Sequence, residues 1–571
     1  MKIKESKFKI ILAVLILTGA ILRFYNLNWG APFYFHPDER NIASAVSQLN
    51  FPDQMNPHFF AYGSLPIYTI YFTGMVVNST QYPMSNIQAT ISNVKFEEAI
   101  IISRVYSAIF SILLIPLLFF IGKKLKDNKA GLLAAFLATM SVGFIQFAHF
   151  GTFEMWLTLF GVLLFWLCLK KVTENTIFLM GLVLGVLVST KVSSLVLFPL
   201  PIIAITLSLF VIPAKAGIQE ERYRSRIKFG MTILKHFILL LIVASSVYII
   251  SNPYVFYDTT AFQSSMKYES TLALGILPVF YTGEFYSTVP GVFQFLYVYP
   301  FLLNPVITFL FIPAFFYILY KGFKERKSSY ILLTTFYIIL FCSQAFLFVK
   351  WTRYMVPTLP FMYLIVAIAL SEVIARNEAI SFIRRLPRLD RELSRIGSLP
   401  LLAMTILIVT CTVFGLSYFA TAFTKPDTRI VAKQFAQTTI PADSQILSEV
   451  YDLGVIPFNE AFKKIDLFNF YDLDSSNPFI KDELQKKLNN SEYIILPSQR
   501  LLKIRLNNPG KFPNGYSFYN DLITGKLRYE KLYETHCDIF CKITYLGDPV
   551  FRYEETVNVF ERPTVFIFRK K

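Results

Sequence analysis

Acidic side chains stand at two points where the chain leaves or enters an apolar run. Asp38 and Glu39 follow the first apolar run, in FHPDER, and Glu154 opens a later run in HFGTFEMW. An ionisable group beside a membrane-spanning segment is costly to place and is usually functional. Two such acids could share a divalent cation, or one could act as a base and the other as a metal ligand. Their spacing equally allows a structural role, in which Asp38 and Glu154 cap the helices that follow them.

The apolar runs around these acids decide the class of protein. Of the 571 residues, 54% are hydrophobic and only 16% are charged. Soluble domains average about 25% charged residues, and a bilayer core demands apolar helices of about 20 residues. The sequence therefore predicts a polytopic membrane protein, mainly α-helical, with eleven spans. We expect these spans over residues 10–26, 100–122, 130–148, 154–169, 175–190, 192–212, 236–251, 292–320, 329–349, 355–374 and 399–421.

The net charge of +17 reflects membrane topology. If the N-terminus is cytoplasmic, the cytoplasmic loops hold 26 Lys and Arg residues, and the external loops of the membrane part hold 6. Cytoplasmic loops are expected to carry such an excess. The bias predicts a multi-pass protein of the cell (plasma) membrane, with the N-terminus in the cytoplasm and the C-terminus outside. Because the cytoplasmic loops account for the net charge, no nucleic-acid partner is expected.

Two regions lie outside these spans. A long first external loop is expected over residues 27–99, and its apolar stretch 65–77 covers only about 20 Å, so it should lie on or dip into the outer leaflet. From residue 425 the composition is mixed, with 21 Lys and Arg against 19 Asp and Glu. We therefore predict a transmembrane domain over 1–424 and a soluble extracytoplasmic α/β domain over 425–571. Its first elements should be helices over 428–438 and 480–488 and strands over 445–450 and 492–497.

The external domain also contains a cysteine pair. Cys537 and Cys541, in HCDIFC, could form a disulfide across one turn of chain outside the membrane. Metal binding by the two cysteines with His536 is the alternative, but no fourth ligand is evident.

Six segments of the membrane part resemble a known family. They are LRFYNLNWGAPFYFHPDER, FFAYGSLPIYTIY, ISRVYSAIFSILLIPLLFFIGKKL, HFGTFEMWLTLF, GLVLGVLVSTKVSSLVLFPLP and KWTRYMVPTLPFMYL. In this order, and with eleven expected spans and external acids, they resemble GT-C fold glycosyltransferases of the protein O-mannosyltransferase and aminoarabinose transferase type (glycosyltransferase family 39-like). The resemblance implies a GT-C helical bundle that transfers a sugar, with inversion, from a polyprenyl-phosphate donor to an acceptor hydroxyl at the outer face of the membrane.

The resemblance also implies roles for the three acids. Asp38 would be the base that takes the proton of the acceptor hydroxyl, with Glu39 as its partner. Glu154 would be the second acid, ordering the acceptor or a metal. The family's His-rich or Asp-x-Asp metal signatures are not clear in this sequence. A divalent cation, Mg or Mn, held by Asp38 and Glu154 therefore stays an open alternative.

Basic residues are expected to bind the phosphate of the donor. Lys191 and Arg353 are the first candidates, and Arg104, inside the second span, is a further one. Tyr354 follows Arg353 in the family's late Arg-Tyr segment and is expected in the same substrate site. The structural alternative for Arg353 is that its side chain snorkels to a lipid headgroup. Lys191, between two spans, must face water or a ligand.

The expected partners are membrane lipid, a lipid-linked sugar donor, and an acceptor protein, lipid or glycan. The loop 251–270 and the segment YTGEFYS after it carry Asp258, Glu269 and Glu284 among aromatic residues. They could shape the acceptor side of a site or form a solvated amphipathic loop. The competing class is a transporter or flippase, which would place its ionisable residues at the membrane midplane.

Overall fold

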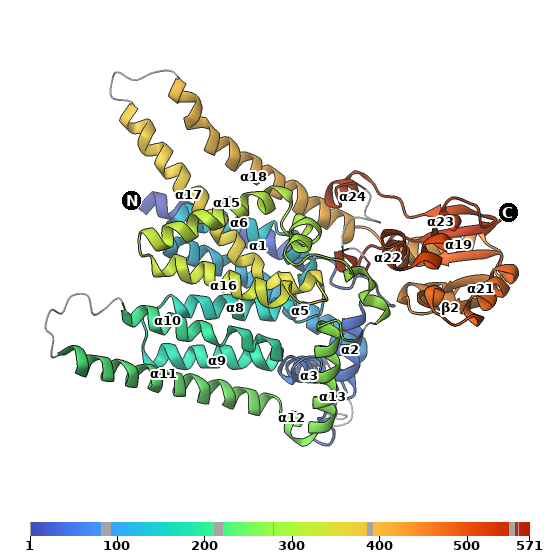
Figure 1. Cartoon of the computed structure of the whole chain (residues 1–571), viewed down its shortest axis with the longest axis horizontal. Coiled ribbons are helices and arrows are strands. Elements are labelled where there is room, and N and C mark those ends of the chain that lie inside the picture. The colour runs from blue at the N-terminus through green and yellow to red at the C-terminus, as the bar shows by residue number, and fades with distance from the viewer. Residues whose placement is uncertain are drawn as a thin grey trace.

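The computed structural model describes residues 2–81, 93–210, 221–277, 279–384, 392–547, 554–557 and 559–571. The helices up to Ala422 form one bundle, and a sheet with its own helices is attached to one end of that bundle (Figure 1). The predicted fold class, a polytopic helical bundle followed by an α/β part, is confirmed.

Helices occupy all eleven stretches that were expected to span the membrane, as far as these stretches are described. They are α1 (Lys2–Phe24), α5 (Phe96–Leu125), α6 (Asn128–Thr139) with α7 (Val142–Ala148), α8 (Glu154–Cys168), α9 (Glu174–Thr190), the 3-10 helix η2 (Val192–Leu197) with α10 (Pro199–Phe210), α11 (Glu221–Ser251), α14 (Tyr299–Leu302) with α15 (Pro305–Lys324), α16 (Ser328–Ala345), α17 (Leu359–Arg384) and α18 (Glu392–Ala422).

The number of full-length spans is smaller than expected. By length and composition, the described residues contain six helices able to cross a membrane, or seven if the bent pair α6 and α7 is one crossing. α8 and α9, with 15 and 17 residues, and the segment Val192–Leu207 are apolar but shorter. Eleven apolar helices therefore do not amount to eleven full-length spans.

One expected span is broken for a local reason. Residues 292–320 contain a π-helical segment, η5 (Gln294–Val298), the short helix α14 directly after it, and the long helix α15, which is separated from α14 at Asn304. Asn304 has a φ of 88° and a ψ of 160°, a backbone conformation that residues other than glycine rarely adopt, and its side chain accepts a hydrogen bond from the amide of Ile307. Pro305 then starts α15 at the position where its missing N–H costs nothing.

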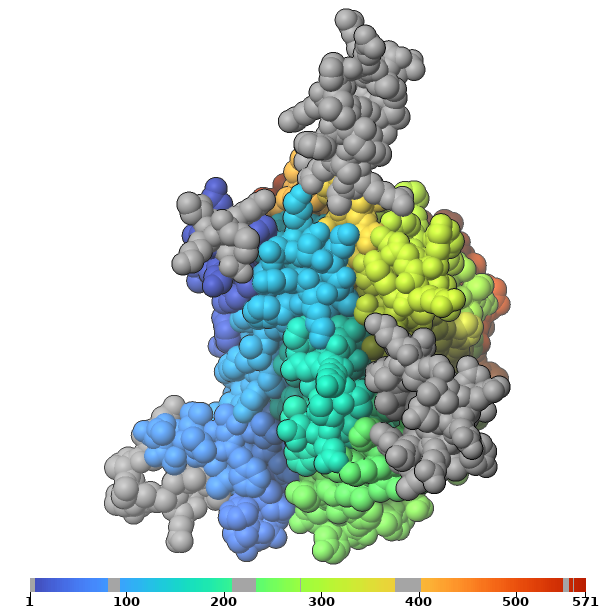
Figure 2. Space-filling view, turned by 90° about the vertical axis from the view of Figure 1, so that its left-hand side faces the viewer, coloured from blue at the N-terminus to red at the C-terminus, as the bar shows by residue number. Residues whose placement is uncertain are grey.

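The first external loop and the segment after α11 contribute helices that lie across one end of the bundle. They are α2 (Pro37–Ser47), α3 (Ser64–Gln81), α12 (Tyr254–Tyr257) and α13 (Thr259–Ala273). Figure 1 looks along α3, whereas α8, α9 and α11 run across the view. In Figure 2 the region of α3 (blue, lower left) extends to one side of the bundle. This is the orientation expected of a helix that lies along a membrane surface and does not cross it.

The C-terminal part is built on a five-stranded sheet with the order β2-β1-β3-β5-β4. β1 pairs in parallel with β2 and β3, and β5 is antiparallel to β3 and β4. The strands are β1 (Ile446–Glu449), β2 (Ile465–Phe468), β3 (Tyr493–Leu496), β4 (Tyr529–Glu534) and β5 (Phe566–Lys570); the helices are α19 (Thr428–Thr439), α20 (Ile456–Asn459), α21 (Phe479–Asn490), α22 (Arg500–Asn507), α23 (Pro513–Ile523) and α24 (Ile539–Thr544). The four elements expected from the sequence are found as α19, β1, α21 and β3. The domain boundary at residue 424 stays a prediction.

Buried polar side chains join the C-terminal part to the bundle. One carboxylate oxygen of Glu561 accepts hydrogen bonds from the side-chain amide of Gln146 on α7 (2.8 Å) and from the hydroxyl of Tyr418 on α18 (3.0 Å). Its other oxygen is buried and has no partner among the described residues. Burial raises the pKa of Glu561 to about 8, because the charged form is disfavoured away from water.

We expect Glu561→Gln to weaken the pH dependence of stability. The carboxyl group binds its proton more tightly in the folded protein, with a pKa of about 8, than in the unfolded chain, with a pKa of about 4.3. It therefore favours the folded state at low pH, and this contribution is lost as the pH rises from about 4.3 to about 8. Between about pH 5 and about pH 9, the unfolding temperature in detergent should fall less for the variant than for the wild type. Equal falls would contradict the prediction.

Candidate active site

Asp38 lies in the first turn of α2 and faces a basic residue of a distant segment. Its carboxylate forms an ion pair with Nη1 of Arg353, in the 3-10 helix η6 (Thr352–Thr358). The helix cap is His36, so the capping role considered for Asp38 is not what the structure shows. Burial alone would raise the pKa of Asp38, but the charge of Arg353, with smaller contributions from His36 and Lys191, brings the pKa below its ordinary value.

Glu39, the next residue, points into the protein. Its two oxygens accept from Nε (2.8 Å) and Nη2 (2.6 Å) of Arg104 on α5, and both side chains are fully buried. Nη1 of Arg104 donates to the carbonyls of Leu27 and Trp29, and one oxygen of Glu39 also accepts from the amide of Gly151. The structure therefore does not bring Glu39 and Arg104 to the cavity described below, and their contacts do not suit the catalytic and phosphate-binding roles expected for them.

Glu154 starts α8 and carries an unsatisfied carboxylate oxygen. The side chain is only 3% exposed, and within the described part of the chain its Oε2 has no hydrogen-bond partner. Glu154 lines a small pocket of about 50 Å³ together with Lys191, Arg353 and Tyr354. A buried carboxylate without a partner is costly, so this arrangement favours a bound group that donates to it.

Lys191 and Arg353 present cationic groups to the same space. Lys191 ends α9, and its ammonium lies 5.4 Å from the ring centre of Tyr62 and 4.9 Å from that of Tyr354. No described residue forms a hydrogen bond or ion pair with this ammonium. The Nε of Arg353 is buried and likewise lacks a partner among the described residues. Both cations are thus placed to bind an anion, and Tyr354 forms an aromatic wall between them.

A cavity of about 910 Å³ connects these groups with the C-terminal part of the chain. Asp38, Lys191, Arg353 and Tyr354 line it from the bundle, and it shares Lys191 and Arg353 with the small pocket of Glu154. Four of the seven residues predicted for the site therefore line one cavity. This volume lies at the upper end of the range for small-molecule sites.

The cavity wall includes residues that the sequence did not single out for this site. Arg500, on α22, lines the cavity and forms a bidentate ion pair with Glu555, which also lines it. Glu269 of α13, which the sequence analysis did consider for the acceptor side of a site, also lines the cavity, and burial raises its pKa. Arg500 starts α22 four residues after the end of β3, and the carboxyl ends of parallel strands are common places for binding residues. That position was the available signal for Arg500.

Carboxylates gather elsewhere at the edge of the cavity. Among the described residues, Glu284, Glu554 and Glu555 bring oxygens within 4.8 Å of one another, the spacing that a metal ion would need. Two of them are already paired, Glu284 with Lys503 (3.2 Å) and Glu555 with Arg500. Asp38 and Glu154, the acids expected to hold Mg or Mn, do not belong to this group.

Comparison with known proteins gives a likeness of fold. No family model and no curated protein matches the sequence. Among solved structures, the chain is similar to the archaeal oligosaccharyltransferase AglB from Archaeoglobus fulgidus in complex with an inhibitory peptide and a dolichol-phosphate, at 12% identity over 99% of this chain and 89% of that chain, with a TM-score of 0.52. The Archaeoglobus fulgidus oligosaccharyltransferase tethered with an acceptor peptide is 13% identical over 99% of this chain and 89% of that chain, with a TM-score of 0.50. ArnT from Cupriavidus metallidurans in the apo state is 12% identical over 86% of this chain and 93% of that chain, with a TM-score of 0.41.

The likeness to the oligosaccharyltransferase shows that this chain has its fold, the GT-C fold. The fold that the sequence resemblance implied is therefore confirmed. At 12 to 13% identity, fold is all that the comparison shows.

We expect Glu39→Gln to destabilise the protein strongly. The change leaves the buried guanidinium of Arg104 without its counter-charge, and breaking a buried pair costs about 3 to 5 kcal/mol. The measurement is the yield and the unfolding temperature of the purified protein. Glu97→Gln is the matched control, because Glu97 is exposed on the same helix as Arg104. A Glu39 variant as stable as the control would contradict this role.

Proposed function

We propose that this protein is a membrane glycosyltransferase that moves a sugar from a polyprenyl-phosphate donor to an acceptor hydroxyl on the outer face of the membrane. One observation carries the proposal: Asp38, Lys191 and Arg353 line one cavity, and Glu154 lines the pocket that shares the two cations with it. A base, a second acid and cations for a leaving phosphate are the groups that such a transfer requires. The GT-C fold supports the same reaction class, since the oligosaccharyltransferase with this fold was solved with a dolichol-phosphate.

In the proposed reaction, Asp38 takes the proton of the acceptor hydroxyl while that oxygen attacks the anomeric carbon of the donor sugar. The bond from this carbon to the phosphate oxygen breaks, and the lipid phosphate leaves with the electron pair. Lys191 and Arg353 stabilise the negative charge that develops on the phosphate. The free oxygen of Glu154 orients the acceptor by accepting a hydrogen bond from it.

Arg353 would couple donor binding to the strength of the base. Without donor, its charge lowers the pKa of Asp38 and makes that carboxylate a weak base. The Nε of Arg353, which no described residue contacts by a hydrogen bond, is free to bind a phosphate oxygen. A bound phosphate would partly neutralise Arg353, so the pKa of Asp38 would rise when the donor is in place.

The residues around Asp38 and Glu154 do not suit a divalent cation bound between these two acids. Mg and Mn prefer several carboxylate, carbonyl or water oxygens. Here Asp38 is paired with Arg353, and the cation Lys191 lines both the cavity of Asp38 and the pocket of Glu154. We therefore assign no step of the reaction to a metal.

We further propose that the N-terminus is cytoplasmic, that the C-terminal part lies outside, and that the membrane is the plasma membrane. The charge bias of the loops supports this orientation. The position of three helices supports the same orientation. These helices, α2, α3 and α13, lie at the end of the bundle that carries the sheet (Figure 1). A transporter or flippase would need its site at the membrane midplane. The cavity is instead lined partly by residues of the C-terminal part, such as Tyr451 and Arg500.

We expect Asp38→Asn to abolish sugar transfer while the protein still folds. The isosteric amide cannot accept the proton, and general base catalysis typically contributes about 10² to 10⁴ in rate. Membranes containing the variant would be incubated with radiolabelled polyprenyl-phosphate hexoses, and labelled protein, lipid and glycan would be separated. Asp53→Asn, in the same loop but exposed and away from the cavity, is the control that should keep wild-type transfer. Transfer by the Asp38 variant at the control rate would refute the assignment.

We expect Arg353→Lys to raise the apparent KM for the donor. An ammonium offers one point of charge and cannot reproduce the planar donors of a guanidinium, which would bind Asp38 and a phosphate oxygen together. Initial rates would be measured against donor concentration and, separately, against acceptor concentration. The KM for the acceptor should change little. An unchanged donor KM with a lower yield of folded protein would favour a purely structural Arg353.

A further inference from the structure

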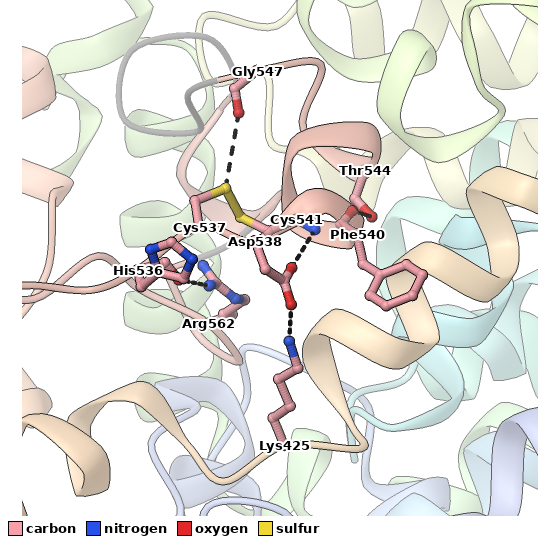
Figure 3. The surroundings of a disulfide bond; sticks show 9 residues. All are labelled: Lys425, His536, Cys537, Asp538, Phe540, Cys541, Thr544, Gly547 and Arg562. Carbon is pink, nitrogen blue, oxygen red and sulfur yellow. Dashed lines mark hydrogen bonds and ion pairs between the residues drawn. A yellow bond between two sulfur atoms is a disulfide. The ribbon is translucent and has the colours of Figure 1, made fainter.

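A disulfide closes a short loop at the edge of the C-terminal part. Cys537 and Cys541 are bonded, as the sequence analysis considered, so their sulfurs are not free to bind a metal (Figure 3). The carboxylate of Asp538, inside the loop, accepts from the amide of Cys541 (3.0 Å) and pairs with Lys425 just beyond α18. These contacts hold the start of α24 in one conformation.

The helix α24 has one buried and one exposed apolar side. Cys541, Thr544 and the following Tyr545 are buried. Ile539 and Phe540, enclosed by the disulfide, are 63% and 45% exposed. Single exposed apolar side chains are normal on a surface, but neighbouring ones that form a patch can mark a contact site.

The depth of α24 along the bundle shows what could cover these side chains. α24 packs against α18, whose segment Leu402–Ala422 is long and apolar enough to cross a membrane. The ring of Tyr545 stacks on Phe301 (5.9 Å between centres), and Phe301 also contacts Tyr418 on α18 (5.7 Å). Tyr418 lies four residues before the end of α18, which is about 6 Å at the rise of an α-helix. α24 therefore lies beside the last turn of this span.

α18, against which α24 packs, also carries exposed apolar side chains. Val409, Val413 and Leu416 are exposed along α18, as expected of a face turned to hydrocarbon. Figure 3 shows the ring of Phe540 extending from α24 beside the ribbon of α18. Lys542, in the last turn of α24, is exposed and adds a positive charge next to the apolar pair. Apolar and aromatic side chains beside lysine are the composition of segments that lie at a membrane interface.

We propose that the disulfide loop is a membrane anchor, which inserts Ile539 and Phe540 into the outer leaflet beside α18. The partner is a phospholipid surface, with acyl chains around the two side chains and headgroup phosphates near Lys542. The disulfide presents the two side chains without a further loss of conformational entropy on insertion. The anchor holds the C-terminal part close to the membrane, and with it Arg500 and Glu555 of the cavity wall. The choice of leaflet rests on the orientation proposed above, but the insertion itself does not depend on the proposed sugar transfer.

Photocrosslinking to lipid tests the anchor directly. A benzophenone amino acid would replace Phe540 in the full-length protein, reconstituted in nanodiscs of phosphatidylglycerol and phosphatidylethanolamine, and mass spectrometry would detect the added mass of a phospholipid. Phe479→benzoylphenylalanine is the matched control, because Phe479 is 75% exposed and starts α21, a helix that lies farther from the bundle than α24 does (Figure 1). We expect a phospholipid adduct at position 540, many-fold more abundant than at position 479.

Every other outcome would overturn the proposal. Equal adducts at the two positions would show chance encounters with lipid, and no adduct at 540 would show that α24 stays above the membrane. An adduct of two protein chains would identify a second copy as the partner of this surface. In the double variant Cys537→Ser, Cys541→Ser that carries the same crosslinker at 540, the lipid adduct should decrease. An undiminished adduct in this folded variant would remove the part of the proposal that concerns the disulfide.

Discussion

The direction of Asp38 depends on the buried ion pair between Glu39 and Arg104. Neighbouring residues on an α-helix point about 100° apart, so two consecutive acids cannot face the same partner. Because Arg104 of α5 holds both oxygens of Glu39, the rotation of α2 about its axis is set, and Asp38 must face the cavity. A buried pair of this kind is strongly maintained, since separating it leaves an uncompensated charge in the interior. Glu39, whose carboxylate is held by Arg104, thus positions Asp38, the acid proposed to act as the base.

The site then assembles from three segments far apart in the chain. α2 supplies Asp38, the end of α9 supplies Lys191, and η6 supplies Arg353. Each of these residues lies at a helix terminus, where a charged side chain can reach the cavity while its backbone remains part of the bundle. The C-terminal part completes the wall with Arg500 and Glu555. The bundle alone would leave the cavity open on that side, so the sheet and its helices are part of the site.

The sequence predicted the positions of elements better than the contacts of side chains. Apolar runs located the helices, and acids or cations beside such runs stood out as Asp38, Glu154, Lys191 and Arg353. The pairing of Glu39 with Arg104 joins residues 65 apart in the chain and depends on tertiary contact, which no local pattern reports. Arg500 was missed because a charged residue is ordinary in a region of mixed composition. The break of the expected span at Asn304 was foreseeable, since Asn-Pro is a turn signal even inside an apolar run.

The interface between the bundle and the C-terminal part contains buried acidic residues. One of them also lines the cavity, so the charge balance of the interface affects the cavity as well. Glu284 of the bundle side meets Glu554 and Glu555 of the C-terminal part, and burial raises the pKa of both Glu284 and Glu555. Lys503 and Arg500 supply two positive charges against three acids. A proton kept on one carboxyl group brings the interface to neutrality, which is the least costly state for buried charges. Because Arg500 and Glu555 also line the cavity, the charges that hold the two parts together are the same ones that shape this side of the site.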